Sequence, residues 1–173
     1  MMYISKMAAS KPVQHKINSQ WTIYYHAPDS SDWSLASYKL IAKVTTIEQF
    51  WTVLNELGPK VIETGMLFIM RGDIPPLWEH YNNAKGGSYS IRVSMKTAEE
   101  IFHKYAASVV GECLLPECSM DTINGISISP KSGDNCIIKI WNQDAKKKAE
   151  AAIPRLQSGI ADVHYSLNDD KRM

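Results

Sequence analysis

The segment INGISISPKSGDNCIIKIW, residues 123–141, contains two strand patterns joined by a turn. Residues 123–129 alternate apolar and polar side chains, which is typical of a half-buried strand. The turn-forming run 129–135 follows, and residues 137–141 are rich in β-branched and aromatic side chains. Two strands joined in this way pair as an antiparallel hairpin. We therefore expect an antiparallel sheet and place the other elements of the chain around this hairpin.

Strand and helix patterns alternate along the rest of the chain. The other predicted strands are residues 21–26, 38–44, 66–70, 88–94 and 161–165. The predicted helices are residues 46–58, 97–110 and 144–157. The first two helices open on capping boxes at Thr46 and Thr97, each with Gln or Glu three residues later. This mixed order predicts the α+β class: a single domain with one curved antiparallel sheet and about three helices on one face.

Length and charge limit the kinds of partner. A chain of 173 residues is long enough for one domain with a sizeable core. The formal net charge of +1 gives no broad basic face, so any contact with nucleic acid should be local. Residues 1–14 lack the apolar core of a signal peptide and predict a flexible N-terminal arm before a domain at 15–173.

The sequence favours binding over catalysis. Cys113, Cys118 and Cys136 lack the spacing of a zinc site, and reduced thiols predict a cytoplasmic or nuclear protein. Nucleophile-elbow, P-loop, dinucleotide and zinc-protease motifs are absent from the sequence, and its histidines are scattered. We therefore predict a protein that is not an enzyme, with no catalytic residue, metal or cofactor.

Two tryptophans lie in turn-forming surroundings: Trp33 follows the run 30–32, and Trp78 follows Pro75-Pro76. The two prolines fix backbone φ angles and predict a stiff loop around Trp78. Most tryptophans pack in cores, and that interpretation stays open for each of them. Two loop tryptophans beside the carboxylate of Glu79 can also hold a flat, electron-poor base, with the rings on its faces and Glu79 at its N–H edge.

Several short motifs together resemble the translation initiation factor 4E family over about residues 15–166. They are Trp21, Trp33, Phe50-Trp51, 76–79 (PLWE), 85–87 (KGG), Gly111-Glu112, Gly133-Asp134 and Ile140-Trp141. That family binds the 7-methylguanosine cap of mRNA in the concave face of a curved antiparallel sheet backed by three helices. The resemblance implies that Trp33 and Trp78 stack on the base, that Glu79 accepts its N–H groups, and that Trp141 lies near the N7-methyl group.

The phosphate-binding positions depart from the family pattern. The family has an arginine before the hairpin turn and a lysine just after Gly-Asp, where this chain has 129–131 (SPK) and Asn135-Cys136. Lys131 is the nearest replacement for the arginine. Lys139 shares a strand face with Trp141 and is our candidate for the second phosphate ligand.

The resemblance also implies a docking surface for partner proteins. Helical periodicity leaves Trp51 open as a core residue or a partly exposed anchor. The family comparison matches it to the exposed tryptophan on which scaffold subunits and repressors dock a helix. His15, Ile47 and Gly111 match other parts of that surface. His103, Lys104 and Ala107 differ from the family's residues, so we expect a partner with an altered helical motif.

These features identify a divergent family member and leave several functions open. The first is a cap-binding initiation factor that recruits a scaffold protein similar to initiation factor 4G. The second is a cap-binding translational repressor, and the third is a structural subunit that has lost cap affinity. An enzyme that acts on caps is the least favoured of the four.

Overall fold

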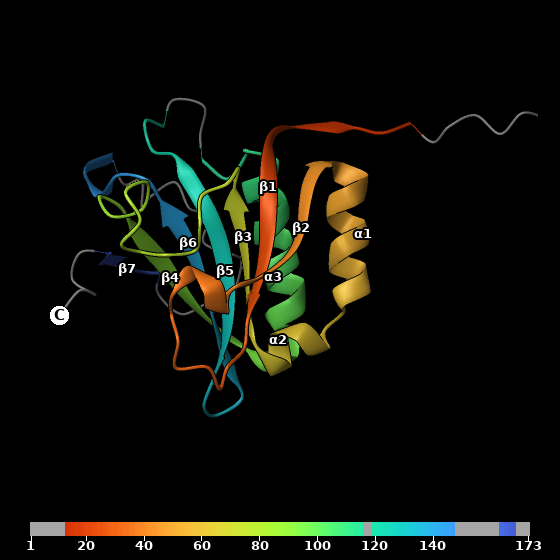
Figure 1. The fold of residues 1–173 in the computed structure, drawn as a ribbon, viewed down its shortest axis with the longest axis vertical. Helices are drawn as coiled ribbons and strands as arrows, with labels where there is room; N and C mark the ends of the chain where they lie inside the picture. Colours follow the sequence, from red (N-terminus) through yellow and green to blue (C-terminus); the bar gives the residue numbers. More distant parts are fainter. Residues whose placement is uncertain (1–12, 116–118, 148–162, 169–173) are drawn as a thin grey trace, which may run out of the picture.

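The computed structural model describes residues 13–115, 119–147 and 163–168, which form a curved, seven-stranded sheet (Figure 1). The strands are β1 (Lys16–His26), β2 (Lys39–Thr46), β3 (Met66–Arg71), β4 (Gly87–Ser94), β5 (Ile123–Lys131), β6 (Asn135–Asn142) and β7 (His164–Leu167). Their order is β2-β1-β3-β5-β6-β4-β7, and every adjacent pair is antiparallel. The predicted hairpin is β5–β6, and the predicted α+β class with an antiparallel sheet is confirmed.

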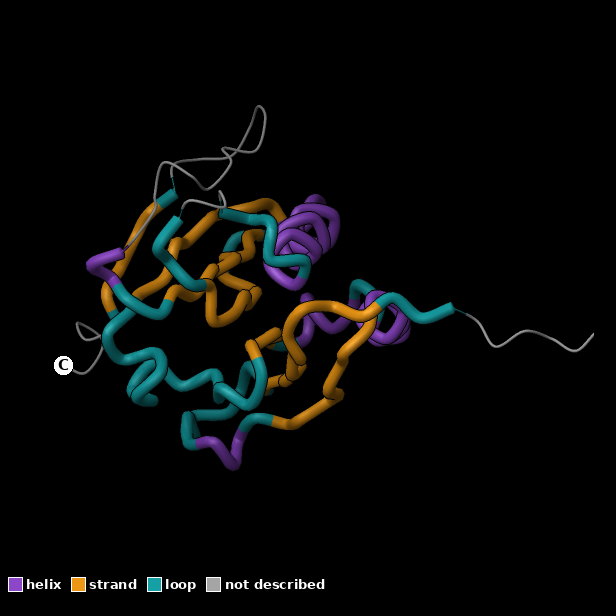
Figure 2. The backbone as a smooth tube through the Cα atoms, turned by 90° about the horizontal axis from the view of Figure 1, so that it is seen from above, coloured by secondary structure: helices purple, strands orange, loops and turns teal. Residues whose placement is uncertain are grey.

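Three helices cover one side of the sheet (Figures 1 and 2). They are α1 (Ile47–Leu57), α2 (Lys60–Thr64) and α3 (Met95–Val110), and two short 3-10 turns, η1 (Leu35–Ser37) and η2 (Ala145–Lys147), lie in loops. No helix among the described residues combines the length and apolar character needed to cross a bilayer. The described residues contain three helices, but α2 was not expected, and residues 145–147 of the third predicted helix, 144–157, form the 3-10 turn η2. Residues 148–157 of the predicted helix lie outside the described residues.

Strand alternation sorts apolar side chains onto two faces. The face toward the helices forms the convex core, whose buried residues include Trp21, Ile23, Ile69, Ile91, Ile126, Ile138, Phe50, Leu54 and Phe102. The opposite face carries a second group, the concave cluster, made of Tyr24, Tyr38, Phe68, Met70 and Trp141. Loop residues Ile74 and Leu77 pack against the concave cluster. One sheet therefore carries a core covered by helices and an aromatic face covered by loops.

The two predicted capping boxes have different outcomes. At α1 the Thr46 hydroxyl accepts from the Gln49 N–H at 3.2 Å, as predicted, and the Gln49 side chain accepts from the backbone of Thr45. The prediction at Thr97 is wrong, because α3 begins earlier and its N-cap is Ser94, which accepts from the Lys96 N–H. The Thr97 hydroxyl instead donates to the Ser94 carbonyl at 3.3 Å.

Other boundaries also differ from the prediction. β1 begins five residues before the predicted residue 21, at Lys16, and β7 ends at Leu167 rather than 165. The predicted N-terminal arm, 1–14, falls outside the described residues except at 13 and 14. Cys113 is an exposed free thiol and Cys136 a buried one, whereas Cys118 lies outside the described residues.

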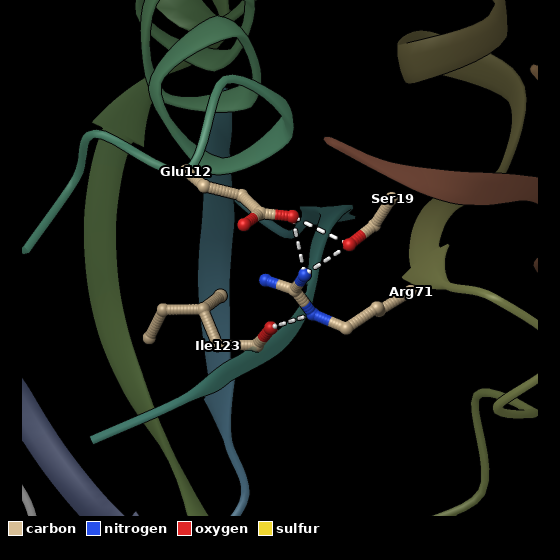
Figure 3. Close-up of polar contacts among 4 residues, drawn as sticks. All are labelled: Ser19, Arg71, Glu112 and Ile123. Atoms are coloured by element: carbon tan, nitrogen blue, oxygen red, sulfur yellow. Dashed lines mark hydrogen bonds and ion pairs between the residues drawn. The ribbon is translucent and has the colours of Figure 1, made fainter. Parts of the chain in front are cut away.

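A half-buried arginine, Arg71, joins the end of β3 to three other parts of the fold (Figure 3). Arg71 Nη1 donates to Glu112 Oε1 at 2.5 Å and to Ser19 Oγ at 2.7 Å, and Nε donates to the Ile123 carbonyl at 2.9 Å. Its guanidinium lies over the Trp21 ring at 4.7 Å, a cation–π contact. Burial pushes the pKa of Glu112 up, but the hydrogen bonds from Ser19 and Arg71 outweigh it and the pKa is lowered.

Candidate binding site on the concave face

A row of side chains crosses the concave face from β1 to β4. Residues paired across adjacent strands place Tyr24, Phe68, Ser127, Lys139 and Ser90 in that row. Aromatic rings therefore occupy the β1–β3 part of the face, and hydroxyl and ammonium groups occupy the β5–β6–β4 part. Such a surface suits a ligand with a flat ring at one end and negative charge at the other.

Trp33 lies at the rim of this face, on the loop between β1 and η1. Its side chain is 43% exposed and stacks on His26, with ring centroids 4.3 Å apart and planes 4° from parallel. His26 is fully buried, and its Nε2 lies 2.9 Å from the Asp32 carbonyl oxygen. The Asp32 carboxylate accepts from Ser34 N–H at 2.8 Å and from Ser34 Oγ, and the backbone bond is the main reason why its pKa is lowered. The loop is thus ordered on both sides of Trp33.

Trp78 lies on the second rim loop, residues 72–86, and is 37% exposed. The loop is held from below by the buried side chain of Asn83, whose Nδ2 donates to the Pro75 carbonyl at 3.0 Å and to the Leu77 carbonyl at 2.8 Å. Asn124, on β5, donates to Asn83 Oδ1 at 3.0 Å. The two prolines are buried, which agrees with the predicted stiff loop. Asn83 was not predicted as a site residue, although asparagine in a turn-rich loop is a common backbone ligand.

Both rim loops lie against the concave cluster, the second through Ile74 and Leu77. Tyr38 contacts His26, with ring centroids 4.8 Å apart, and packs edge-on against Phe68 at 5.3 Å. The pKa of Tyr38 is raised to about 12, first by burial and then by the negative charge of Glu79. The exposed carboxylate of Glu79, beside Trp78, therefore lies near the residues that support Trp33. Trp33 and Trp78, which are 45 positions apart in the sequence, thus border the same part of the concave face.

Trp141 lies at the base of the site. It is 5% exposed, its Nε1 donates to Ser127 Oγ at 3.0 Å, and Phe68 contacts it edge-on at 6.3 Å. Its orientation is fixed by the hydrogen bond and by packing, whereas Trp33 and Trp78 each keep exposed surface. The three tryptophans singled out by sequence thus have different settings, two at the rim and one at the base.

The two predicted phosphate ligands come together on the same face. Lys139 lies on β6 one alternation from Trp141 and is half-buried, and Lys131 is exposed at the end of β5. Burial lowers the pKa of Lys139, and the positive charge of Lys131 lowers it further. Within the described part of the chain neither lysine forms a salt bridge. An anion placed between them would relieve their mutual repulsion.

The other predicted binding residues lie on the helical side of the molecule. His15 Nδ1 and Glu48 Oε1 are 2.6 Å apart, the His15 N–H donates to Glu48 Oε2 at 2.9 Å, and the Ile47 N–H donates to the His15 carbonyl. These bonds, led by the one from the His15 side chain, lower the pKa of Glu48 to about 2. His15 is thus fixed to the first turn of α1 beside Ile47, which is 45% exposed.

Trp51 is half-buried, which agrees with the partly exposed alternative rather than with a core residue. One side packs edge-on against Phe50 at 5.1 Å, and another contacts the His103 ring of α3 at 5.7 Å. Gly111 is exposed at the C-terminal cap of α3. We call the surface formed by His15, Ile47, Trp51, His103 and Gly111 the helical surface. His103 is an addition that the family pattern did not contain, and burial lowers its pKa.

A separate pocket of about 530 Å³ lies where α3 ends and β5 begins. It is lined by Arg71, Glu112, Cys113, Asp121 and Thr122, among others, and the residues predicted for base, phosphate and partner binding do not line it. The described residues also contain no group of three His, Cys, Asp or Glu side chains arranged to hold a metal ion. The pocket therefore does not coincide with the concave site.

Comparison with known sequences points to one family. A family model described as "Eukaryotic initiation factor 4E" matches residues 16–171. Eukaryotic translation initiation factor 4E of Candida glabrata is 31% identical over 147 residues, which are 79% of this chain and 66% of that protein. The Saccharomyces cerevisiae protein is also 31% identical, over 79% of this chain and 65% of its own length. The matched region thus spans about two thirds of these relatives.

Solved structures share the fold. A complex of C. elegans eIF4E-3 with the 4E-binding protein Mextli and a cap analog superposes with a TM-score of 0.77 at 18% identity, covering 92% of this chain and 96% of that one. Schistosome eIF4E in complex with m7GpppG and 4E-BP gives a TM-score of 0.77 at 22% identity, covering 93% and 92%. Ascaris suum eIF4E-3 with m7G cap gives 0.69 at 22% identity, covering 81% and 78%.

Proposed function

The chain belongs to the eukaryotic initiation factor 4E family, and on that premise we propose that it binds the 7-methylguanosine 5′ cap of mRNA between Trp33 and Trp78. The solved relatives hold m7G cap, m7GpppG or a cap analog. The observation that carries the proposal is the position of both rim loops against the concave cluster. Trp33 stacks on His26, which contacts Tyr38, and Ile74 and Leu77 of the second loop pack against the same cluster. This arrangement supplies exposed ring faces, a carboxylate and a pair of lysines on one side of the sheet.

Stacking supplies affinity and selects the methylated base. Stacking of a base on an aromatic side chain contributes about 1–3 kcal/mol. Methylation at N7 makes guanine a cation, which adds a cation–π term of roughly 2 kcal/mol when water is excluded. Trp141 lies at the base of the site, and we assign it to the methyl side of the ligand. The hydrogen bond from its Nε1 to Ser127 holds that indole in place.

Glu79 recognises the guanine edge in this proposal. Its carboxylate accepts the N1–H and N2–H groups, and each hydrogen bond to a charged group contributes about 1.5–3 kcal/mol. Tyr38, with a pKa of about 12, is a neutral phenol at physiological pH, so it does not repel the carboxylate. Adenine lacks the two adjacent donors, so the same carboxylate disfavours it.

Lys131 and Lys139 bind the phosphate chain. Their positions on β5 and β6 continue from the aromatic part of the concave face, so a base at the rim directs its phosphates toward them. The half-buried Lys139 has lost part of its hydration, which an anionic ligand replaces. Two cations on this side suffice for local recognition in a chain whose net charge is only +1.

The helical surface is proposed to bind a helix of a partner protein, either a scaffold similar to initiation factor 4G or a 4E-binding repressor. Two of the solved relatives are bound to Mextli or 4E-BP. His103 against Trp51, with Lys104 next to it, changes the chemistry of the surface, so a standard Tyr-x-x-x-x-Leu peptide should bind more weakly than a partner suited to it. Tight binding of the standard peptide would contradict this part of the proposal.

The altered helical surface also supports a second candidate, a cap-binding translational repressor that does not recruit the scaffold. A structural subunit without cap affinity is the third candidate, supported by the loss of the family's phosphate-binding arginine. Each candidate is a binding protein rather than an enzyme. We propose a cytoplasmic location, with a nuclear fraction, because mRNA is made in the nucleus and translated in the cytoplasm.

A fluorescence titration with 7-methyl-GTP and plain GTP tests the cap assignment. We expect quenching that favours 7-methyl-GTP in the wild-type protein and its loss in Trp78→Ala and Glu79→Gln. Trp51→Ala is the matched control, because it removes a tryptophan on the helical side and should leave cap affinity unchanged. An equal response to both nucleotides would contradict cap recognition. Capture of partner proteins from lysate then separates an initiation factor from a repressor that does not recruit the scaffold. In that experiment Trp51→Ala is the test variant and Trp78→Ala is the control.

A further inference from the structure

His26 contacts Trp33 in two ways. Its ring lies parallel to the indole at 4.3 Å, and its Nε2 lies 2.9 Å from the carbonyl oxygen of Asp32, the residue just before Trp33. Both the ring and the backbone of the tryptophan segment are therefore held by one side chain. His26 is fully buried at the end of β1, so its own position is set by the sheet.

The same imidazole has one nitrogen without a partner. A carbonyl oxygen only accepts hydrogen bonds, so Nε2 must carry the proton that reaches Asp32. In the neutral ring Nδ1 is then an acceptor, and no described group donates to it. A second proton would go to this buried atom and would leave a cation in face contact with Trp33.

We propose that His26 is a positioning residue for the cap-stacking tryptophan. The neutral imidazole holds the indole of Trp33 in one orientation, and the opposite face of that indole receives the methylated base. When His26 is protonated, two cations share one π system, so the indole has less attraction for the methylguanine. This inference rests on the proposed cap-binding function, but the contact between the two rings does not.

The charged and titratable groups around His26 come from three elements. Asp32, on its own loop, supplies a carboxylate that is held by Ser34. Tyr38, next to β2, contacts the imidazole and has a pKa of about 12, so it stays neutral. Glu79, on the second rim loop, acts on Tyr38. On β3 the paired residue is the apolar Met66.

The ring contact is tested without ligand, by tryptophan fluorescence from about pH 8 to about pH 5.5, the range in which histidine ordinarily titrates. An imidazolium in face contact quenches an indole, so acidification should dim the wild-type protein. Trp33→Phe removes the indole and His26→Phe removes the imidazole, so both variants should lose this pH-dependent change in emission. If His26→Phe keeps the full pH-dependent quenching, the proposed contact is wrong.

The effect on cap binding is tested by titrating 7-methyl-GTP over the same pH range. The nucleotide itself titrates, so wild type and His26→Phe are compared at each pH. We expect wild-type affinity to fall about threefold to tenfold more than that of His26→Phe on acidification, the range of a weak to moderate cation–π term.

Two further variants separate positioning from a general structural role. His26→Leu removes the stacking ring and should weaken 7-methyl-GTP binding at every pH, whereas His26→Phe should restore most of the affinity near pH 8. Wild-type affinity in His26→Leu, or parallel pH profiles for wild type and His26→Phe, would overturn the proposal. If wild-type protein binds no 7-methyl-GTP, the cap-binding function and the role of His26 in it both fail, and the fluorescence series still decides the ring contact.

Discussion

The two faces of the sheet are both rich in apolar side chains, but they are covered differently. The convex core is closed by α1, α2 and α3, and its largest members, such as Trp21, Phe50 and Phe102, are at most 2% exposed. The concave cluster is covered by two loops, and its neighbours Trp33 and Trp78 keep 43% and 37% of their surface exposed. The first face is held by packing, and the second by hydrogen bonds within loops.

This difference indicates how one sheet serves stability and binding. Side chains of the convex core gain their full transfer free energy on folding. Rings at the concave rim gain only part of their transfer free energy on folding. The remaining part is gained when a ligand covers them. Substitutions on the two faces should therefore separate loss of stability from loss of affinity.

The largest effect is expected for Phe102→Ala in the convex core. Removing a fully buried phenyl ring leaves a cavity and should lower the free energy of unfolding by about 3–5 kcal/mol. Urea denaturation measures this change, and binding of 7-methyl-GTP should survive wherever the variant is still folded. If Phe102→Ala destabilised the fold as little as Trp78→Ala, the proposed contrast between the two faces would be wrong.

Trp78→Ala should weaken ligand binding and leave stability nearly unchanged. Loss of one stacking ring should weaken 7-methyl-GTP binding by about 2–4 kcal/mol, the sum of stacking and part of the cation–π term. Stability should change by no more than about 0.5 kcal/mol, as for other surface substitutions. Calorimetric titration and urea denaturation on the same preparation test both halves of the prediction.

Asn83→Ala should lower both stability and cap affinity, because Asn83 is buried and its side chain holds the loop that carries Trp78. The Pro75 carbonyl would lose its partner, and the Leu77 carbonyl and the Asn124 amide would each lose one of two, with an expected cost of about 1–3 kcal/mol in stability. The Trp78 loop would then be less ordered, so cap affinity should fall as well. Unchanged affinity in a destabilised variant would show that this network does not position Trp78.

Lys139→Met should give a smaller effect that depends on the ligand. We expect about tenfold weaker binding of 7-methyl-GTP, or about 1.4 kcal/mol, and little change for 7-methylguanosine, which has no phosphates. Lys60→Met is the matched control, because Lys60 is an exposed lysine of α2, on the helix-covered side of the sheet. Equal losses for both ligands would indicate a change in the fold of the site rather than a lost phosphate contact.

The smallest effect is expected from the His15–Glu48 pair on the helical surface. The pKa of Glu48 falls from its ordinary 4.5 to about 2 in the folded protein, so the carboxylate stabilises the fold fully above about pH 4.5. That contribution is lost as pH falls toward about 2. The stability difference between wild type and Glu48→Gln should therefore be constant above about pH 5 and should shrink below it, as followed by thermal unfolding.

Features set by nearby residues were predictable from the sequence. Alternation located the β5–β6 hairpin, the Thr46–Gln49 pattern located the start of α1, and prolines indicated the stiff loop before Trp78. The wrong capping prediction shows where local reasoning ends. Thr97 and Ser94 are both suitable caps, and α3 begins after Ser94 because the Met95 N–H finds the carbonyl of Asp134, in the distant β5–β6 turn.

The missed site residues depend on long-range contacts. Asn83 obtains a partner from Asn124, 41 residues away, and nothing in the local pattern indicates that pairing. His26 and Trp33 are close in sequence, but the stacking of their rings depends on how the loop between them turns back. The short helix α2 follows a Gly-Pro stop signal and is stabilised by burial of Ile62 in the convex core. Residue types indicated the chemistry of the site, and tertiary structure supplied its support.

The strand order has a consequence for synthesis on the ribosome. β1, β2 and β3 are neighbours in the sheet and also come first in the chain, so they can pair early. In the described structure β4 pairs only with β6 and β7, which are made later. A nascent chain that ends before residue 135 therefore carries β4 as an unpaired strand and lacks Trp141 and Lys139. Such non-local pairing folds slowly and exposes strand edges in the meantime, so we expect nascent chains of this length to depend on chaperones and to lack affinity for capped RNA.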